Sequence, residues 1–290
     1  MKGVKEVKQR LKSVANIQKI TRAMEMVAAT KLRRLQDRAL STRPFAEKIE
    51  GMISRVAAHV EPSVSPLLRE YERVEDEAVI VVAGDRGLCG PYNANVFRHL
   101  TKHLRALEEE GVTPHVFVFG KRTQSFVARL RNVEVDYVYP NPVEKIVYRD
   151  VGYLTSDLSK GFLDGSWQRV RVIYTAMKTM ASFVPTTADV LPLPKAPEAE
   201  EEGDVDYILE PSPRTLMLRL LPRFIEMQLF AAVLEALASE FAARRIAMKN
   251  ATDNADEMIG LLTMEYNKAR QAGITGELLD IVGGAEAQAG

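Results

Sequence analysis

The glycines of one short turn are the first residues to consider as a binding site. The stretch GDRGLCGPYNANVF, residues 84–97, follows an apolar run and precedes a helical pattern. Glycine-rich turns in this position can present backbone amides to a phosphate. The stretch matches neither G-x-G-x-x-G nor G-x-x-x-x-G-K-[ST], and no suitably placed acid follows it to bind a ribose. We therefore favour a tight structural turn over a nucleotide site and expect no cofactor.

Cys89, His99 and His103 are the other candidates for catalysis or metal binding. Cys89 is the single cysteine, which permits no internal disulfide, and nothing in the sequence places a histidine beside it to activate it. His99 and His103 have the four-residue spacing of a helical metal site, but the glutamate of H-E-x-x-H is missing. No Ser, His and Asp set and no carboxylate pair stands out. The sequence therefore predicts no catalytic and no metal-binding residue.

The charge of the chain is zero in sum but uneven along its length. Through Arg43 the sequence has twelve Lys and Arg against Glu6, Glu25 and Asp37, and residues 198–210 contain seven acids and no base. A basic segment on a neutral protein is typical of a local contact with an acidic partner. A solvated helix face and a nucleic-acid surface are the alternatives. The sequence has no run of about 18 apolar residues, so we expect no membrane insertion.

The turn and the histidines belong to a central region of alternating strands and helices. Apolar runs predict strands at 77–83, 115–120, 133–139 and 170–177. Amphipathic segments predict helices between them at 93–111, 121–130 and 147–165. This order indicates βαβ units and a mostly parallel sheet. The stretch rich in proline and acids at 191–206 is expected to be a loop, after which Ser212 and Pro213 begin another helix.

Two long helical segments bracket this region. The first covers about residues 2–58, and its apolar seam is predicted to drift: Val4, Val7, Leu11 and Val14 are followed one position out of register by Ile17, Ile20, Met24 and Val27. Gln18, Thr21 and Glu25 stand where a strict heptad has apolar residues. In the second segment, steps of 4 and 3 run from Leu220 to Ala269 and are broken only by Arg245 and Thr252.

Matched seams at the two ends of the chain predict an antiparallel coiled coil. With residue 58 opposite residue 213, the numbers of paired residues sum to about 271, so Met1 faces residue 270. Residues 271 to about 282 then protrude as a single helix. Pro222 lies inside the second segment and removes one helical donor, so the long helix is expected to kink or to start there, with 216–221 as a separate turn.

Several long stretches of the sequence resemble the gamma subunits of bacterial F-type ATP synthases. They are QKITRAMEMVAATKLRR at 18–34, GDRGLCGPYNANVF at 84–97, LPLP at 191–194, YILEP at 207–211, LASEFAARRIAMKNATDNADEMI at 237–259 and YNKARQAGITGELLDIVGGA at 266–285. The resemblance covers nearly the whole chain, although Pro91 replaces the second glycine of the family's usual G-G. It implies a long antiparallel coiled coil of N- and C-terminal helices plus a central Rossmann-like α/β domain with a mostly parallel sheet.

The resemblance also implies a function. In that family the helix pair is a rotor shaft inside a ring of three alpha and three beta subunits. It couples proton-driven rotation to ATP synthesis, or ATP hydrolysis to reverse rotation, and is not itself an enzyme. The epsilon subunit and the membrane c-ring are the other implied partners, and no nucleic acid is among them. The implied location is peripheral, at the cytoplasmic face of the bacterial plasma membrane.

Contact residues follow from the matched positions. Met24, Lys31, Arg33 and Arg34 match positions near an acidic loop of the beta subunits. Positions that contact the beta subunits deeper in the ring are matched by Arg244, Gln271, Thr275 and Glu277, and the protruding tip matches a helix held in an apolar sleeve. Tyr207 and Glu210 match positions that face the membrane ring or the epsilon subunit.

The expected division of the chain is a coiled-coil helix at 1–58, an α/β domain at 74–195, an acidic linker at 196–211 and a second coiled-coil helix at 212–286. Two alternative functions remain. One is a small-molecule enzyme built on the α/β domain, with the helices as dimerisation arms, which ligand binding by the isolated chain would favour. The other is a nucleic-acid binder, which steep salt dependence of DNA binding would favour.

Overall fold

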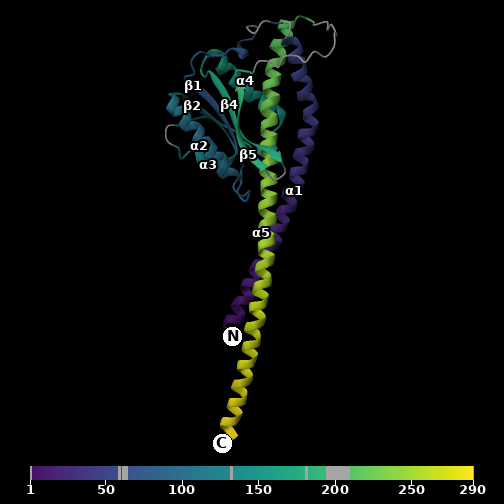
Figure 1. Ribbon diagram of the computed structural model, residues 1–290, viewed down its shortest axis with the longest axis vertical. Coiled ribbons are helices and arrows are strands. Elements are labelled where there is room, and N and C mark those ends of the chain that lie inside the picture. The colour runs from purple at the N-terminus through teal and green to yellow at the C-terminus, as the bar shows by residue number, and fades with distance from the viewer. Residues whose placement is uncertain are drawn as a thin grey trace. The chain divides into compact units, whose positions relative to one another are not determined.

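The computed structural model describes residues 2–57, 60, 65–130, 133–179, 182–193 and 210–289 (Figure 1). The chain divides into two compact units, a larger one of Thr30–Ala243 and a smaller one that combines Met1–Ala29 with Arg244–Gly290. Two long helices, α1 (Lys2–Ala57) and α5 (Pro213–Ala289), contribute residues to both units. Most of the expected acidic linker, including Tyr207, lies outside the described residues.

The larger unit is built on a five-stranded sheet. Its strands are β1 (Asp76–Val82), β2 (Thr113–Phe119), β3 (Glu134–Val138), β4 (Arg169–Thr179) and β5 (Ser182–Leu191). Their order in the sheet is β3-β2-β1-β4-β5, with the first four parallel and β5 antiparallel to β4. The prediction of a mostly parallel sheet is confirmed.

Helices cover the two faces of this sheet. They are α2 (Tyr92–Glu110), α3 (Lys121–Val127) and α4 (Tyr148–Asp164), with 3-10 turns η2 (Pro66–Leu68) and η3 (Val143–Lys145). α2 and α3 bury their apolar residues against Val79, Val81 and Val118 on one face. The connection through α4 runs back across the sheet from β3 to β4, so a right-handed crossover places α4 on the other face.

Strand β5 was not predicted. Its sequence, SFVPTTADVL, contains Pro185 and two threonines, and its side chains do not alternate cleanly between buried and exposed. Pro185 is acceptable because β5 is an edge strand that pairs only with β4. The strand therefore forms because it pairs with β4 in a hairpin. Its only fully buried residues are the last two, Val190 and Leu191.

At one position in this unit, two backbone segments approach so closely that the residue must be glycine. Gly120 connects β2 to α3 with a φ of +98°, and a Cβ there would lie 2.3 Å from the carbonyl oxygen of Ala83. Only glycine can adopt this conformation in that space. The contact brings the start of α3 against the segment that follows β1, where the glycine turn begins.

In the smaller unit the helices α1 and α5 meet along one regular seam. The buried residues that keep the predicted steps of 4 and 3 on α5 are Met248, Thr252, Ala255 and Leu262. Arg244 is also buried, whereas the predicted seam residue Arg245 is exposed. On α1 the buried residues Val7, Thr21 and Ala28 are spaced by whole heptads. Helix α5 runs through Pro222 from Pro213, with Ser212 accepting the backbone N–H of Thr215 at 3.3 Å, so residues 216–221 are not a separate turn.

The predicted drift of the α1 seam does not occur. Ile17 and Ile20 are 53% and 58% exposed, and the seam continues instead through Gln18 and Thr21. Thr21 Oγ1 lies 2.7 Å from Thr252 Oγ1, and Gln18 Nε2 donates to Asp256 Oδ1. The polar residues are tolerated in the seam because they bond to one another across it. A strict heptad therefore persists, and the isoleucines are left on the outer face.

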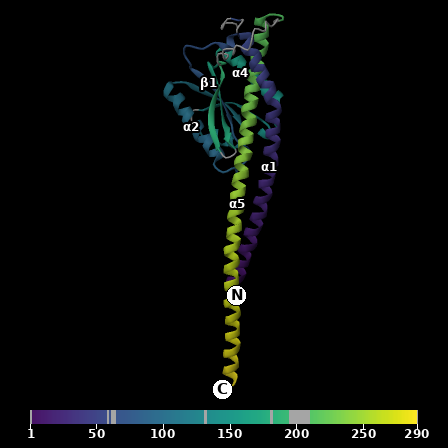
Figure 2. The ribbon, with the colours of Figure 1, turned by 45° about the vertical axis from the view of Figure 1, so that its right-hand side comes forward.

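The observed register leaves a single-helix tip on α5. The pairs Gln18–Asp256 and Thr21–Thr252 have residue numbers that sum to 274 and 273, against the predicted value near 271. The first residue of α1 therefore pairs about two residues further along α5 than expected. Figures 1 and 2 both show α5 continuing past the N-terminus of α1. The apolar residues of this tip, Ile274, Leu278, Leu279, Ile281 and Val282, are 50–68% exposed.

Candidate functional site

The carboxyl ends of β1 and β4 form the place where Rossmann-type domains bind nucleotides. The strand order reverses here, because β1 pairs with β2 on one side and with β4 on the other. The glycine turn directly follows β1 at this place. A ligand would need open space over the turn and backbone amides that are not already bonded.

The turn is instead bonded to the protein itself. Gly84 N donates to Asn93 Oδ1 at 3.0 Å. The Asp85 carboxylate accepts the backbone N–H groups of Lys121 at 3.1 Å and of Val143 at 2.8 Å. These bonds tie the turn to α2, to the start of α3 and to the connection between β3 and α4. The first backbone N–H of the turn and the Asp85 side chain are therefore engaged in holding the fold.

Helix α5 fills the space over the turn. Glu240 is only 6% exposed, and a Cβ on Gly84 would lie 2.7 Å from its Oε1. The hydroxyl of Tyr92, the first residue of α2, donates to the carbonyl of Ala236 on α5 at 2.9 Å. The crevice is thus a docking site for α5, which agrees with the structural turn and not with a nucleotide site. No feature of the sequence marked Glu240 as the residue that fills it.

Cys89, His99 and His103 do not assemble into a reactive site. Cys89 is buried and accepts Asn93 Nδ2 at 3.4 Å. His99 Nε2 lies 2.8 Å from Thr187 Oγ1 on β5, and burial, followed by the charges of His103 and Lys102, lowers the pKa of His99. The described residues contain no group of three or more His, Cys, Asp and Glu that could hold a metal ion.

His103 belongs to a buried ionic network that sequence reasoning missed. Its Nε2 lies 2.6 Å from Oε1 of Glu77, whose side chain is fully buried in β1. Arg169 and Arg171 of the neighbouring β4 complete the network, with Arg169 Nε donating to Glu77 and Arg171 Nη1 3.6 Å from it. The signal was a glutamate at the start of an apolar strand and an R-V-R run in another. The network satisfies a buried charge and so serves the fold.

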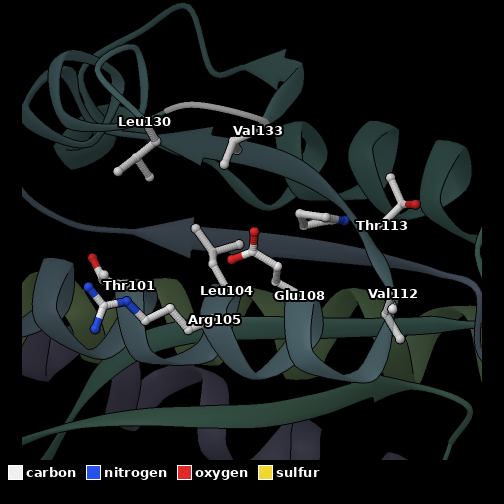
Figure 3. Close-up of a pocket in the computed structure, with 10 residues that line it drawn as sticks. Thr101, Leu104, Arg105, Glu108, Val112, Thr113, Leu130 and Val133 are labelled. Atoms are coloured by element: carbon white, nitrogen blue, oxygen red, sulfur yellow. The ribbon is translucent and has the colours of Figure 1, made fainter.

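One pocket of about 390 Å³ lies between α2 and the start of β2 (Figure 3). Leu104, Val112, Leu130 and Val133 form its apolar lining, with Thr101, Arg105 and Glu108 at its edge. The polar groups shown lie along α2, except for Thr113 at the start of β2, and they do not converge on one point in the pocket. This arrangement offers no set of groups for catalysis.

The predicted contact residues near the N-terminus fall into different environments. Arg33 and Arg34 are exposed on α1. Lys31, in contrast, lies 2.5 Å from Glu144 Oε2 and 5.2 Å from the ring centre of Phe241. Met24 is half-buried in the smaller unit.

The predicted contacts on α5 also differ in exposure. Gln271, Thr275 and Glu277 are exposed near its C-terminal end, whereas Arg244 is 8% exposed. Glu210 is exposed shortly before α5. Among the predicted contact residues that the structure describes, no set therefore comes together as a pocket. It presents most of them as separate surface positions. Within the described residues, no helix is long and apolar enough to cross a membrane.

Comparison with known proteins identifies relatives over the whole chain. The model of the family described as ATP synthase matches residues 3–288. The ATP synthase gamma chain of Dehalococcoides mccartyi is 40% identical over 291 residues, covering 100% of each chain. The gamma chain of Geobacter metallireducens is 38% identical over 287 residues, covering 99% of each chain. That of Moorella thermoacetica is 39% identical over 287 residues, again covering 99% of each.

Solved structures share the fold. A chain of the Euglena gracilis mitochondrial ATP synthase matches with a TM-score of 0.63 at 17% identity, covering 98% of this chain and 94% of that one. A chain from the central stalk and c-ring structure of the Tetrahymena thermophila mitochondrial ATP synthase matches with a TM-score of 0.58 at 22% identity, covering 80% and 99%. These likenesses support the architecture, and the sequence identities decide the family. The chain belongs to the ATP synthase gamma-chain family.

Proposed function

We propose that this chain is the central rotor shaft of an F-type ATP synthase. The observation that carries the proposal is the antiparallel pair of α1 and α5, which ends in a single helix with an exposed apolar surface. A helix with five large apolar residues exposed within nine positions is stable in water only at a cost, and it fits an apolar sleeve in partner subunits. Gamma chains at about 38–40% identity and nearly full coverage support this assignment.

The shaft has no chemistry of its own. The crevice over the glycine turn, where a Rossmann-type domain would bind a nucleotide, is filled by Glu240 and its neighbours on α5. Catalysis in this proposal belongs to the beta subunits, and the shaft changes which conformation each of them prefers. An asymmetric body that turns inside a ring contacts each beta subunit differently, and that difference in contact free energy shifts the conformational populations of the three sites.

Exposed residues are the proposed contacts with these partners. Arg33 and Arg34 on α1 face solvent and suit an acidic loop of a beta subunit. Gln271, Thr275 and Glu277 are proposed to contact beta subunits near the end of α5. Met24, half-buried at the seam, contributes its remaining surface.

The other proposed contacts involve different partners, or residues that are already engaged or buried within the chain. Glu210 and Tyr207 are proposed to face the membrane c-ring or the epsilon subunit. The contacts of Lys31 and Arg244 with a beta subunit stay predictions, because Lys31 already has an internal ion pair and Arg244 is buried. Since the named relatives are bacterial gamma chains, we place the complex at the cytoplasmic face of a bacterial plasma membrane, with this chain as a peripheral subunit.

Reconstitution tests the proposal against the two alternatives. The purified chain is mixed with alpha and beta subunits of the same source, and the complex mass, ATP hydrolysis and rotation of a probe on the chain are measured. We expect one copy of the chain with three alpha and three beta subunits, and no nucleotide turnover by the chain alone. Nucleotide turnover by the isolated chain would support the enzyme alternative. Tight, salt-dependent binding to duplex DNA without assembly would support the nucleic-acid alternative.

A further inference from the structure

Two basic residues of α1 face into the larger unit, although their neighbours Arg33 and Arg34 face solvent. Lys31 Nζ lies 2.5 Å from Glu144 Oε2 and 5.2 Å from the ring centre of Phe241. Arg38 Nη2 donates to the carbonyl of Ile146 at 2.9 Å, and its guanidinium lies 5.8 Å from the ring centre of Phe230. Each cation therefore makes one polar contact and one cation–π contact.

The two sets of contacts repeat along the helices. Lys31 and Arg38 are seven residues apart, about two turns, so they lie on the same face of α1. Phe230 and Phe241 are eleven residues apart, about three turns of α5, so their rings also lie on one face. The polar partners, Glu144 and the Ile146 carbonyl, both belong to the connection between β3 and α4. One face of α1 is thus joined to the same two elements twice.

The connection between β3 and α4 is a firm anchor for these contacts. Val143 and Ile146 are both 1% exposed, and Val143 N donates to Asp85 at 2.8 Å. Tyr148, at the start of α4, packs edge-on against Phe230 with ring centres 5.6 Å apart. The segment that receives Lys31 and Arg38 is therefore held by the sheet, by the glycine turn and by α5. Contacts to it restrict where α1 can lie within the larger unit.

We propose that Lys31 and Arg38 form a latch that fixes α1 to the β3–α4 connection and to α5, and that Arg33 and Arg34, and not these two residues, supply the basic contact to an acidic partner. A cation 2.5 Å from its own carboxylate has most of its field neutralised, so an outside carboxylate gains little from it. The partner half of this inference rests on the proposed function, and the latch half does not.

A charge-swap cycle tests the latch. Lys31→Glu, Glu144→Lys and the double variant are compared with the unchanged chain in urea unfolding. The pair is part-exposed, at 38% and 37%, so we expect each single variant to raise the unfolding equilibrium constant about two- to fivefold and the double variant to restore it. If the swap distorts the site, Lys31→Met and Glu144→Gln give the same cycle without reversed charge. Additive effects in both cycles would overturn the latch.

Partner binding separates the two roles of the basic residues. The same variants and Arg34→Glu are titrated with the alpha and beta subunits at several salt concentrations. We expect Arg34→Glu to slow association and reduce its salt dependence while the unfolding curve is unchanged. The double swap should associate like the unchanged chain. If Lys31→Glu and the double swap lose association equally, Lys31 is a partner contact and the proposal is wrong.

Arg38 provides a second readout of the latch. Arg38→Lys keeps the charge but loses the planar guanidinium that reaches a carbonyl and stacks on a ring. We expect this variant to raise the unfolding equilibrium constant in urea, while its association with the alpha and beta subunits is unchanged. If the unchanged chain fails to assemble with alpha and beta subunits, the proposed function fails, but the unfolding measurements still decide the latch.

Discussion

The two halves of α5 have the same backbone conformation but very different surroundings. In the larger unit, nearly every residue from Leu229 to Ala243 is buried, because the sheet, α2 and α1 surround the helix. In the smaller unit, the buried residues described on α5 lie three, four or seven positions apart as far as Leu262, and most of the others face solvent. The first half is a core element of a domain, and the second half is one helix of a coiled coil.

This contrast explains where apolar surface remains on the molecule. In the first half, Ser239 donates to the carbonyl of Thr175 at 2.9 Å and small alanines allow the backbone to approach the sheet. In the second half, Met258, beside the seam, is 50% exposed, and Leu261 and Met264 are 56% and 64% exposed. The apolar residues of the first half are buried in the domain core. In the second half, those outside the seam are available to partners, as the proposed function requires.

Replacing one buried leucine in each half by alanine gives the largest expected effect on the unfolding free energy. Leu229 is fully buried, and Leu262 lies in the seam at 5% exposed. We expect Leu229→Ala to cost about 3–4 kcal/mol of unfolding free energy, and Leu262→Ala about 2 kcal/mol, because a two-helix seam collapses around a cavity more easily than a domain core does. Urea unfolding followed by circular dichroism measures both. Equal losses would contradict the difference between the halves.

The fit of α5 over the glycine turn predicts the next effect. Gly84→Ala would place a Cβ 2.7 Å from Glu240 Oε1, so we expect a loss of about 1–3 kcal/mol. Gly87→Ala, on the same turn, is the matched control, since its Cβ would be 3.5 Å from Arg122 Nη2. That variant should lie within about 0.5 kcal/mol of the unchanged chain. A neutral Gly84→Ala variant would show that α5 does not dock tightly there.

The polar layer in the seam predicts a non-additive pair. Thr21→Val or Thr252→Val alone removes the hydrogen bond across the seam, at a cost of about 0.5–1.5 kcal/mol, while the remaining hydroxyl still donates to a carbonyl of its own helix. The double variant removes both hydroxyls and should return close to the stability of the unchanged chain. A double-mutant cycle in urea gives the coupling. Two additive losses would mean that the hydroxyls do not act as a pair.

Two histidines of the larger unit predict opposite dependences on pH. His115 lies between Asp76 and Asp136, each 3.1 Å away; burial would lower its pKa, but the two carboxylates outweigh burial and raise it above 6.5. Its contribution is therefore present below pH 6.5 and is lost as the pH rises through the folded-state pKa.

For His99, burial and nearby cations lower the pKa, so its contribution is present above pH 6.5 and is lost as the pH falls. Thermal unfolding between about pH 5.5 and 8 should show that His115→Gln loses stability mainly in acid. His99→Gln should gain stability there relative to the unchanged chain. The same response from both variants would contradict these environments.

The tip of α5 gives the smallest expected effect on the isolated chain. Leu279 is 67% exposed, so Leu279→Ser should change the unfolding free energy by less than about 0.5 kcal/mol. In the assembled complex the same variant should reduce ATP-driven rotation, because it places a hydroxyl where the proposed apolar sleeve holds the helix. A loss of stability in the isolated chain, with rotation unchanged, would place Leu279 in the fold and not in a partner contact.

Local patterns were enough to predict much of the fold. The runs that form β1, β2, β3 and β4 are apolar and short, and the three helices between them have one apolar face, so their type and order follow from the sequence. The seam of α5 from Met248 to Leu262 could also be predicted, because a heptad repeat places its a and d residues on one face of a long helix.

Other features depended on neighbours distant in the sequence. The α1 seam passes through Gln18 and Thr21 because Asp256 and Thr252 face them, and no local pattern on α1 can reveal those partners. Strand β5 forms because β4 offers an edge, although its own sequence contains a proline. The prediction of a drifting seam was wrong for the same reason that β5 was missed: the decisive hydrogen bonds are non-local.

The sequence by itself determined the types and order of the elements other than β5, and the family, since these depend on periodicity and on matched motifs. Only the tertiary structure decided that the glycine turn holds Glu240 and not a ligand, and that Lys31 faces Glu144 while Arg33 and Arg34 face solvent. Residue types do not fix such choices, because a glycine or a lysine is compatible with either outcome. The choice is made by whichever side chain the fold brings within a few ångströms.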